Sequence, residues 1–317
     1  YNAYQSMKDL DKYLILIYLI QKTFTHYTDL MVIISEETIY AQDTFEIDKI
    51  NLIEISEELG IPKETVRRKI NELSKEGIIE RSGKRIILKV NAFQKQRPVK
   101  TVKTLASFLA ICSNLISSES NLLSSVPKES IESFIRTNFT LIWRFYFKTQ
   151  IPTMIDWRKY YGDLETWVVT GVVLINQSLK LRDLFKGKGI TLDLDTMTNE
   201  DKFKRVYEFI FSNSDKIIGV NASSIAEITG IPRATVIRKL KYASKFGLLT
   251  RDKNQLYLIK KLSPAKMKEF AKIASTIQQR TYKFIGTFFE LYKNKAQLPQ
   301  AKYFFIFVCN NNFIRCL

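Results

Sequence analysis

The side chains with the clearest chemical potential are lysines and arginines, gathered in two similar stretches that begin at Gly60 and Gly230. The first stretch is GIPKETVRRKINELSKEGII and the second is GIPRATVIRKLKYASKFGLL. No carboxylate pair, nucleophile with a neighbouring base, or nucleotide-binding fingerprint appears in the sequence. These are the residues of a helix that presses cations against a polyanion, so we expect a binding protein and not an enzyme.

The charge of the chain supports this interpretation. The net charge is +17 and the pI is about 9.6. Residues 59–100 hold 12 basic and 4 acidic side chains, and residues 229–272 hold 12 basic and 2 acidic ones. These two segments together carry +18, so the rest of the chain is close to neutral. Charge focused on two similar elements indicates a polyanionic partner.

The two stretches belong to a longer repeat. Residues 51–81 align with residues 221–251 without a gap, and 14 of the 31 positions are identical. An internal duplication is the simplest source of such similarity.

Each copy has the residues that begin and end short helices. Asn51 and Asn221 are suited to N-cap a first helix, because their side-chain oxygens accept hydrogen bonds from the free amides of its first turn. Gly60 and Gly230 are suited to end that helix, since glycine adopts the left-handed conformation without steric cost. The proline two residues after each glycine suits the first turn of the next helix, where a missing N–H costs nothing.

The second helix of each copy has an apolar face and a basic face. Apolar residues recur at i, i+4 and i+7, and they are Val66, Ile70 and Leu73, then Val236, Leu240 and Ala243. The candidate DNA-contacting residues are Lys63, Glu64, Thr65, Arg67 and Arg68 in the first copy and Arg233, Thr235, Arg238 and Lys239 in the second. Glu64 either pairs with Arg68 one turn later or accepts a hydrogen bond from cytosine. Such a pair of helices forms a helix-turn-helix, whose second helix enters the major groove.

A β-hairpin is expected after each second helix. GIIERSGKRIILKV has Ile86, Leu88 and Val90 on one face, with its turn at Ser82-Gly83. GLLTRDKNQLYLI places Leu256 and Leu258 around a turn at 252–254. The basic residues of the hairpin tips are Arg81, Lys84, Arg85, Arg251 and Lys253. A basic tip beside such a helix is a wing placed to meet phosphates.

The segment ISEELGIPKETVRRKINELSKEGIIERSGKRIIL resembles the winged helix-turn-helix of bacterial transcription regulators of the cyclic-AMP-receptor and MarR types. In the cyclic-AMP-receptor type, an Arg-Glu pair at the start of the second helix and an Arg one turn later contact bases. The resemblance places those roles on Lys63, Glu64 and Arg68. The second copy has Arg233, Ala234 and Arg238, so it lacks the acidic residue and implies a different specificity.

These observations predict a mainly α fold with two tandem winged helix-turn-helix modules. The first module is expected over 1–152, with its helix-turn-helix at about 51–77 and its wing at 78–90. The second is expected over 153–317, with the corresponding parts at about 221–247 and 248–259. Each module includes flanking helices, and DLDKYLILIYLIQ at Asp9 resembles DLETWVVTGVVLIN at Asp163. The boundary is placed near Pro152.

The remaining sequence features indicate no cofactor and no metal. Cys112, Cys309 and Cys316 form no metal-binding spacing and no even disulfide set, which favours the cytoplasm. No apolar run approaches the roughly 20 residues that cross a bilayer, so no membrane partner is expected. The first residues suggest a truncated end and not a secretion signal. Eight aromatic residues between 143 and 167 suggest either a core between the halves or an effector pocket.

Three classes of function stay open. The first is a sequence-specific regulator of transcription that binds double-stranded DNA, as a monomer acting as a pseudo-dimer or as a homodimer, with any small-molecule effector unidentified. The second is a replication initiator with tandem winged helices. The third is a winged-helix adaptor that contacts proteins.

Overall fold

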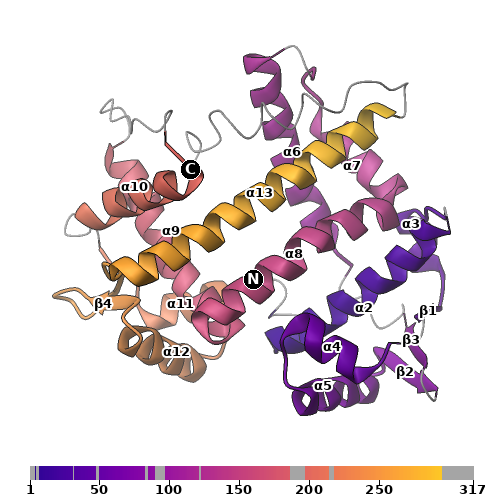
Figure 1. Cartoon of the computed structure of the whole chain (residues 1–317), viewed down its shortest axis with the longest axis horizontal. Helices are drawn as coiled ribbons and strands as arrows, with labels where there is room; N and C mark the ends of the chain where they lie inside the picture. The colour runs from indigo at the N-terminus through magenta and orange to yellow at the C-terminus, as the bar shows by residue number, and fades with distance from the viewer. Residues whose placement is uncertain are drawn as a thin grey trace. The chain divides into compact units, whose positions relative to one another are not determined.

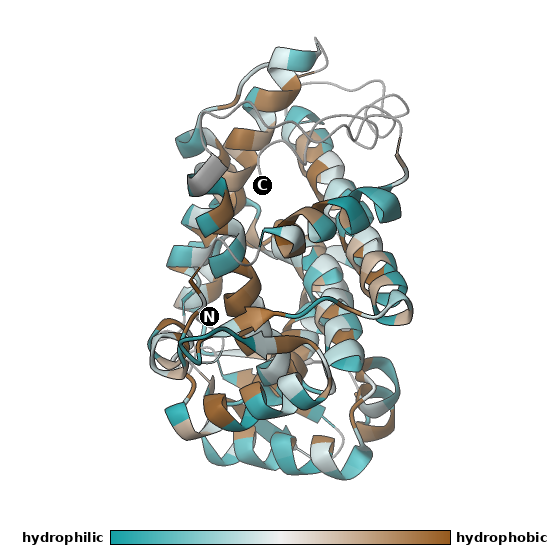
Figure 2. Ribbon diagram, turned by 90° about the vertical axis from the view of Figure 1, so that its left-hand side faces the viewer, coloured by the Kyte–Doolittle hydropathy of each residue, from teal (hydrophilic) through white to brown (hydrophobic). Residues whose placement is uncertain are grey.

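The computed structural model describes residue 4 and the ranges 7–30, 32–47, 50–82, 85–89, 97–120, 123–185, 197–213 and 218–294. The described chain is mainly helical, with short antiparallel strands (Figure 1). Along the helices, hydrophobic and hydrophilic residues follow one another in short blocks (Figure 2), as expected of helices with one buried face.

The chain divides into two compact units. Unit 1 combines Tyr1–Tyr13 with Thr153–Gln278, and unit 2 combines Leu14–Pro152 with Gln279–Leu317. The divisions fall inside three helices, which are α2 (Leu10–Asp29), α8 (Phe139–Tyr161) and α13 (Pro264–Asn294). The module limits expected from the sequence stay a prediction.

Unit 2 contains the first of the two repeated segments. Its short helix α4 (Leu52–Leu59) is N-capped by Asn51, whose side chain accepts a hydrogen bond from the Glu54 amide at 2.8 Å. Gly60 ends the helix with a φ of +62°, a conformation that favours glycine. Pro62 then occupies the N-cap of α5 (Lys63–Lys75), one position earlier than the expected first turn. Both expected helices are therefore present, and the turn between them is tight.

The side chains packed between these two helices are apolar and inaccessible to solvent. Val66, Ile70 and Leu73 on α5 have no exposed surface, and neither does Ile55 on α4. Fully burying one such side chain contributes about 1.5–3 kcal/mol. The apolar stripe predicted for the second helix is thus what fixes its orientation.

A three-stranded antiparallel sheet follows in unit 2, in the order β1-β3-β2. β2 (Ile79–Ser82) and β3 (Arg85–Lys89) form the expected hairpin, but Ser82, predicted in its turn, is the last residue of β2 and pairs with Arg85. β1 (Thr44–Ile47), which pairs with β3, was not predicted, because its partner lies about 40 residues further along the chain. Ile86 and Leu88 are buried as expected, and Val90 lies outside the described residues.

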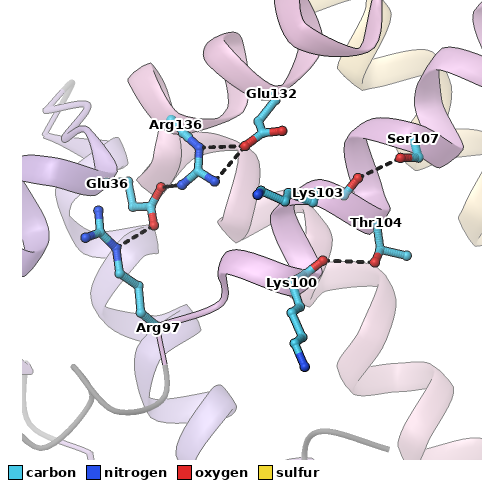
Figure 3. A network of polar contacts seen from close by, with 8 residues as sticks. All are labelled: Glu36, Arg97, Lys100, Lys103, Thr104, Ser107, Glu132 and Arg136. Atoms are coloured by element: carbon cyan, nitrogen blue, oxygen red, sulfur yellow. Dashed lines mark hydrogen bonds and ion pairs between the residues drawn. The ribbon is translucent and has the colours of Figure 1, made fainter.

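A buried carboxylate joins three other elements of unit 2 (Figure 3). Glu36 begins α3 (Glu36–Ala41) and is 1% exposed. It accepts a hydrogen bond from Arg97 Nε at 2.7 Å and another from Arg136. Arg97 precedes α6 (Val99–Glu119), and Arg136 belongs to α7 (Lys128–Thr137), which packs against α6. The two guanidinium groups compensate the cost of burying this charge.

By length and composition, α6 is apolar enough to cross a membrane, contrary to the expectation that no run would qualify. Core helices of soluble proteins pass the same test. The apolar side of α6 is buried within unit 2, where Val102, Ala106 and Leu109 have no exposed surface.

Unit 1 contains the second repeated segment. Its elements are α9 (Leu164–Phe185), α10 (Asn199–Ser212), α11 (Ala222–Thr229), α12 (Arg233–Lys245), β4 (Leu249–Arg251) and β5 (Tyr257–Ile259). Asn221 caps α11 through the Ser224 amide at 2.8 Å, and Gly230 ends it with a φ of +71°. Helix α9 packs against α11, α12 and β5, and its Gln177 side chain accepts a hydrogen bond from the Ile259 amide at 2.5 Å.

Helix α8 continues through Pro152, where the sequence suggested a boundary. The aromatic residues on either side of this proline pack in different units. Trp143 stacks on Phe139 in unit 2, with ring centroids 4.8 Å apart. Trp157 contacts Trp167 and Phe270 in unit 1, at 6.5 and 5.4 Å. Each group therefore belongs to the core of its own unit.

Candidate nucleic-acid interface

Helix α5 presents a polar face directly opposite its buried stripe. Glu64, Arg68, Asn71 and Lys75 recur at i, i+4, i+7 and i+11, a spacing that aligns side chains along one side of a helix. Glu64, Arg68 and Lys75 are exposed, and Asn71 is half-buried. Because the apolar stripe is closed, this outward face is the part of α5 available to a groove of DNA.

The acidic residue of this face is already paired within the helix. Arg67 donates two hydrogen bonds to the Glu64 carboxylate, at 2.6 and 2.9 Å. The hydrogen bonds from Arg67 hold the pKa of Glu64 below its ordinary value. Arg68 is 64% exposed and only approaches Glu72, at 3.8 Å. The partner of Glu64 is thus Arg67 and not Arg68, and the Arg68 guanidinium is available for a base edge.

Helix α12 presents the corresponding face with a different character. Ala234, Arg238, Lys241 and Lys245 occupy the same spacing and are all exposed. No acidic residue occurs anywhere in α12, and neither Lys241 nor Lys245 has an acidic partner within the described ranges. This face is therefore more strongly positive than that of α5.

The structure gives some candidate residues a different position. Lys239 was expected on the basic face, but its ammonium group lies 2.7 Å from the Asp163 carboxylate and the side chain is only 14% exposed. Lys239 sits about 100° around the helix from Arg238, on the side that packs against α9. The Lys239 prediction is therefore corrected to an internal ion pair.

The other candidates on these helices lie at the edges of the faces. Lys63 is exposed, whereas Thr65 and Thr235 are half-buried on the flank that leads to the core. Arg233 is exposed and donates a hydrogen bond from Nε to the Ser223 hydroxyl at 3.0 Å. These residues border the outward faces without standing at their centres.

Sequence reasoning missed four residues of the outward faces, which are Asn71, Lys75, Lys241 and Lys245. The signal that identifies them is the apolar stripe itself, because the most exposed positions of a helix lie opposite its buried ones.

The wing of unit 2 places cations at the hairpin end. Arg81 and Arg85 are both exposed, on neighbouring strands. Lys89 pairs with Glu80 across the hairpin at 2.8 Å, so that charge is partly compensated. The candidate Lys84 lies outside the described residues.

The wing of unit 1 is organised by a single carboxylate. Asp252 accepts hydrogen bonds from the amides of Leu256 at 2.9 Å, Asn254 at 2.8 Å and Gly219 at 3.3 Å. The bond from Leu256 contributes most to holding the pKa of Asp252 below its ordinary value. Lys253 follows directly and is exposed at the tip. The turn thus fixes the position of the backbone that carries the Lys253 side chain.

The Arg251 side chain is held by contacts within the wing, so it is less available to a phosphate than the sequence suggested. Its guanidinium lies over the Tyr257 ring, 4.9 Å from the centroid, and donates to the Tyr257 hydroxyl at 2.7 Å. The predicted alternation of Leu256 and Leu258 is also wrong. Tyr257, Leu258 and Ile259 are all buried. This is because β5 pairs with β4, packs against α9 and is joined to Val220 by a β-bridge at Tyr257.

Comparison with known proteins identifies part of this site. Residues 46–83 match the model of the DeoR-like helix-turn-helix domain. No curated protein and no solved structure shows a significant similarity to the chain. The matched segment covers α4, α5, β2 and the last two residues of β1, and it therefore includes the helices that position the outward face of α5. The match identifies this segment as a helix-turn-helix DNA-binding domain, and it supports DNA as a binding partner of the chain.

Proposed function

We propose that the chain is a sequence-specific regulator of transcription that binds double-stranded DNA through two helices, α5 and α12. The observation that carries the proposal is the outward face of α5, because it combines exposed Arg68 with a match to a helix-turn-helix domain. The proposal assigns no catalysis to the chain and places it in the cytoplasm, where DNA is accessible.

The second helix enters the proposal because its segment resembles the first in detail. α11 and α12 have the same lengths as α4 and α5, eight and thirteen residues. Both segments have an asparagine N-cap and a left-handed glycine between the helices. After the second helix, a bond runs from the Ile78 amide to Leu73 at 3.0 Å, and an equivalent one from the Leu248 amide to Ala243 at 2.9 Å. We infer that residues 221–259 form a second winged helix-turn-helix, produced by duplication.

The two helices are suited to unequal tasks. α5 carries the Glu64–Arg67 pair beside Arg68, so it offers both a hydrogen-bond acceptor and donors to base edges. α12 offers Arg238 to a base edge without a neighbouring acceptor, while its Lys241 and Lys245 suit phosphates. We therefore assign the stricter sequence preference to α5.

The test is the salt dependence of binding to duplex DNA. Each phosphate neutralised by a lysine or arginine releases counterions, so log K falls with log[salt] by about 0.9 per contact. Two modules with a few contacts each predict a slope of roughly −6 to −10. A salt-independent affinity, or no binding to any duplex at low salt, removes DNA from the account and leaves the adaptor. A map of bound genomic sites then separates a regulator, at promoters, from a replication initiator, at an origin.

A further inference from the structure

Two aromatic rings lie exposed beside the basic face of α12. Tyr242 and Phe246 stand one turn apart, 43% and 39% exposed. Their rings are almost parallel, with an interplanar angle of 7° and centroids 6.0 Å apart. We call this pair the aromatic platform. The equivalent positions in the first repeat are Glu72 and Glu76, so the helix-turn-helix fold does not require aromatic residues there.

The surroundings hold the platform in place at the Tyr242 hydroxyl and over one face of Phe246. A Cβ atom on Gly162 would lie 2.8 Å from the Tyr242 hydroxyl, so the tyrosine rests against backbone that only glycine leaves open. Lys266 places its ammonium group 3.6 Å from the centroid of the Phe246 ring and also donates to the Phe246 carbonyl. Lys266 therefore occupies one face of Phe246, and the rest of the platform keeps the exposure given above.

The charge around the platform is positive. Lys241 and Lys245 are exposed on the same helix, and Lys266 adds a third cation. The nearby Asp163 carboxylate is bound to Lys239, which compensates its charge. Exposed aromatic faces among lysines fit a ligand that combines flat π-systems with negative charge.

We propose that the aromatic platform binds unstacked bases of a single-stranded nucleic acid, while the lysines around it bind the phosphates. Aromatic side chains in a positively charged groove are how proteins bind single strands without sequence preference. A base inside a duplex cannot use the platform, because both of its faces are already stacked on its neighbours. The platform lies beside the outward face of α12 and shares Lys241 and Lys245 with it, but its use of unstacked bases goes beyond the duplex binding proposed above.

The position of the platform on α12 allows both sites to be used. Tyr242 follows Arg238 by four residues, so it lies only about 40° around the helix axis from that arginine. A strand that leaves a duplex held by Arg238 would meet the platform on the adjacent flank. The proposal thus predicts tighter binding to a duplex with a single-stranded extension than to a blunt one.

The experiment compares the whole chain with ring variants on fluorescent oligo(dT), oligo(rU) and a blunt duplex. Tyr242→Ala and Phe246→Ala should each weaken binding of the single strand on the order of tenfold, and leave the blunt duplex affected much less. The matched controls Tyr242→Phe and Phe246→Tyr keep a ring and should bind as the wild type does. The tighter of oligo(dT) and oligo(rU) identifies which strand the site prefers.

A second measurement detects the stacking directly. An oligonucleotide that contains 2-aminopurine should lose fluorescence when it binds the wild type, and much less when it binds the alanine variants. Failure of the wild type to bind either single strand, or alanine variants that bind as tightly as the wild type, overturns the proposal. An equal loss on single strands and on the blunt duplex also overturns it, since the rings would then belong to the duplex interface. Absence of duplex binding with ring-dependent binding of single strands would instead reject the duplex function and keep the platform.

Discussion

Arg68 and Arg238 are the residues whose exposure and position best suit contact with base edges. Both stand at the centre of an outward face, and Arg68 has only a distant contact to Glu72 at 3.8 Å. An arginine of this kind can donate two parallel hydrogen bonds to guanine, which lysine cannot do with the same geometry.

We predict that Arg68→Ala weakens binding to the preferred site by about 1–3 kcal/mol and relaxes the preference at one base position. Arg85→Ala should weaken binding to all sequences about equally, because wing residues contact phosphates. The measurement is binding to a panel of duplexes with single base changes, and Arg68→Lys is the control that keeps the charge. Uniform weakening by Arg68→Ala would assign that arginine to phosphate.

The sequence correctly predicted the burial of individual residues where that burial depends on the period of a single helix. Val66 and Ile70 are buried as expected, because the 3.6-residue period places them on one side whatever packs there. Lys239 was misplaced, because its ion pair depends on Asp163, 76 residues earlier in the chain. Glu64 was predicted to pair with Arg68 or to contact cytosine, and its partner is instead Arg67, which is also within reach along the helix.

At the scale of elements, local signals predicted the helices, and non-local pairing decided the strands. The asparagine caps and left-handed glycines are short-range features, so α4, α5, α11 and α12 begin and end close to where the sequence indicates. β1 and the full burial of β5 depend on partners far along the chain, and no local pattern shows them. The module boundary that the sequence placed near Pro152 falls within α8, which continues through the proline.

The ion pair between Lys239 of α12 and Asp163 predicts that the stability of the protein depends on pH. Burial alone would raise the pKa of Asp163, but its hydrogen bond with Lys239 lowers the pKa below the ordinary value. A lowered folded-state pKa stabilises the protein above the unfolded value of about 3.9, and this stabilisation is lost as the pH falls through the folded value. Asp163→Asn should therefore cost roughly 1–3 kcal/mol at neutral pH, and the difference should shrink below about pH 4.

Thermal unfolding of both proteins between pH 7 and pH 3 measures this difference. Asparagine can still accept the hydrogen bond from the Thr166 amide, at 2.8 Å in the wild type, so the helix cap of α9 is kept. Asp163→Ala, which removes the cap as well, provides the comparison. A constant difference between wild type and Asp163→Asn at all pH values would mean that the ion pair contributes no stability.

The wing of unit 1 gives a second prediction for an element. Asp252→Ala removes the acceptor of three backbone amides, so the turn that carries Lys253 should lose its fixed shape. Because wings contact phosphates, the affinity should fall for all duplex sequences alike, with no change in base preference. Asp252→Asn keeps one acceptor oxygen, so its affinity for duplex DNA should lie between those of the wild type and Asp252→Ala. Binding to matched and mismatched duplexes measures both quantities, and a changed base preference would place the wing on base edges.

At the scale of the whole molecule, charge was the most informative property of the sequence. Residues 59–100 and 229–272 hold the entire net charge, and the structure places part of it on the outward faces of α5 and α12 and on the wings. How the flanking helices divide between the units could not be predicted from the repeats. The division in α8 falls directly after Pro152, whereas α2 and α13 have no proline or glycine where theirs fall.

The last prediction is that one chain acts as a pseudo-dimer. If an approximate two-fold axis relates the two modules, their helices contact half-sites one DNA turn apart, about 34 Å. The bound sequence is then an imperfect inverted repeat, because α5 offers Glu64 and Arg67 where α12 offers Ala234 and Ile237. Those two residues can contact a thymine methyl group but donate no hydrogen bond, so the half-site of α5 should tolerate fewer base changes.

Footprinting combined with the mass of the complex measures both the symmetry and the number of chains. The expected result is one chain that protects two unequal half-sites in opposite directions. Arg68→Ala should then weaken protection of the stricter half-site first, and Arg238→Ala that of the other. Two half-sites in the same direction would show that the modules are related by translation. One protected half-site per chain, or a complex that forms only with two chains, would reject the pseudo-dimer, because the second module would then not engage the same duplex.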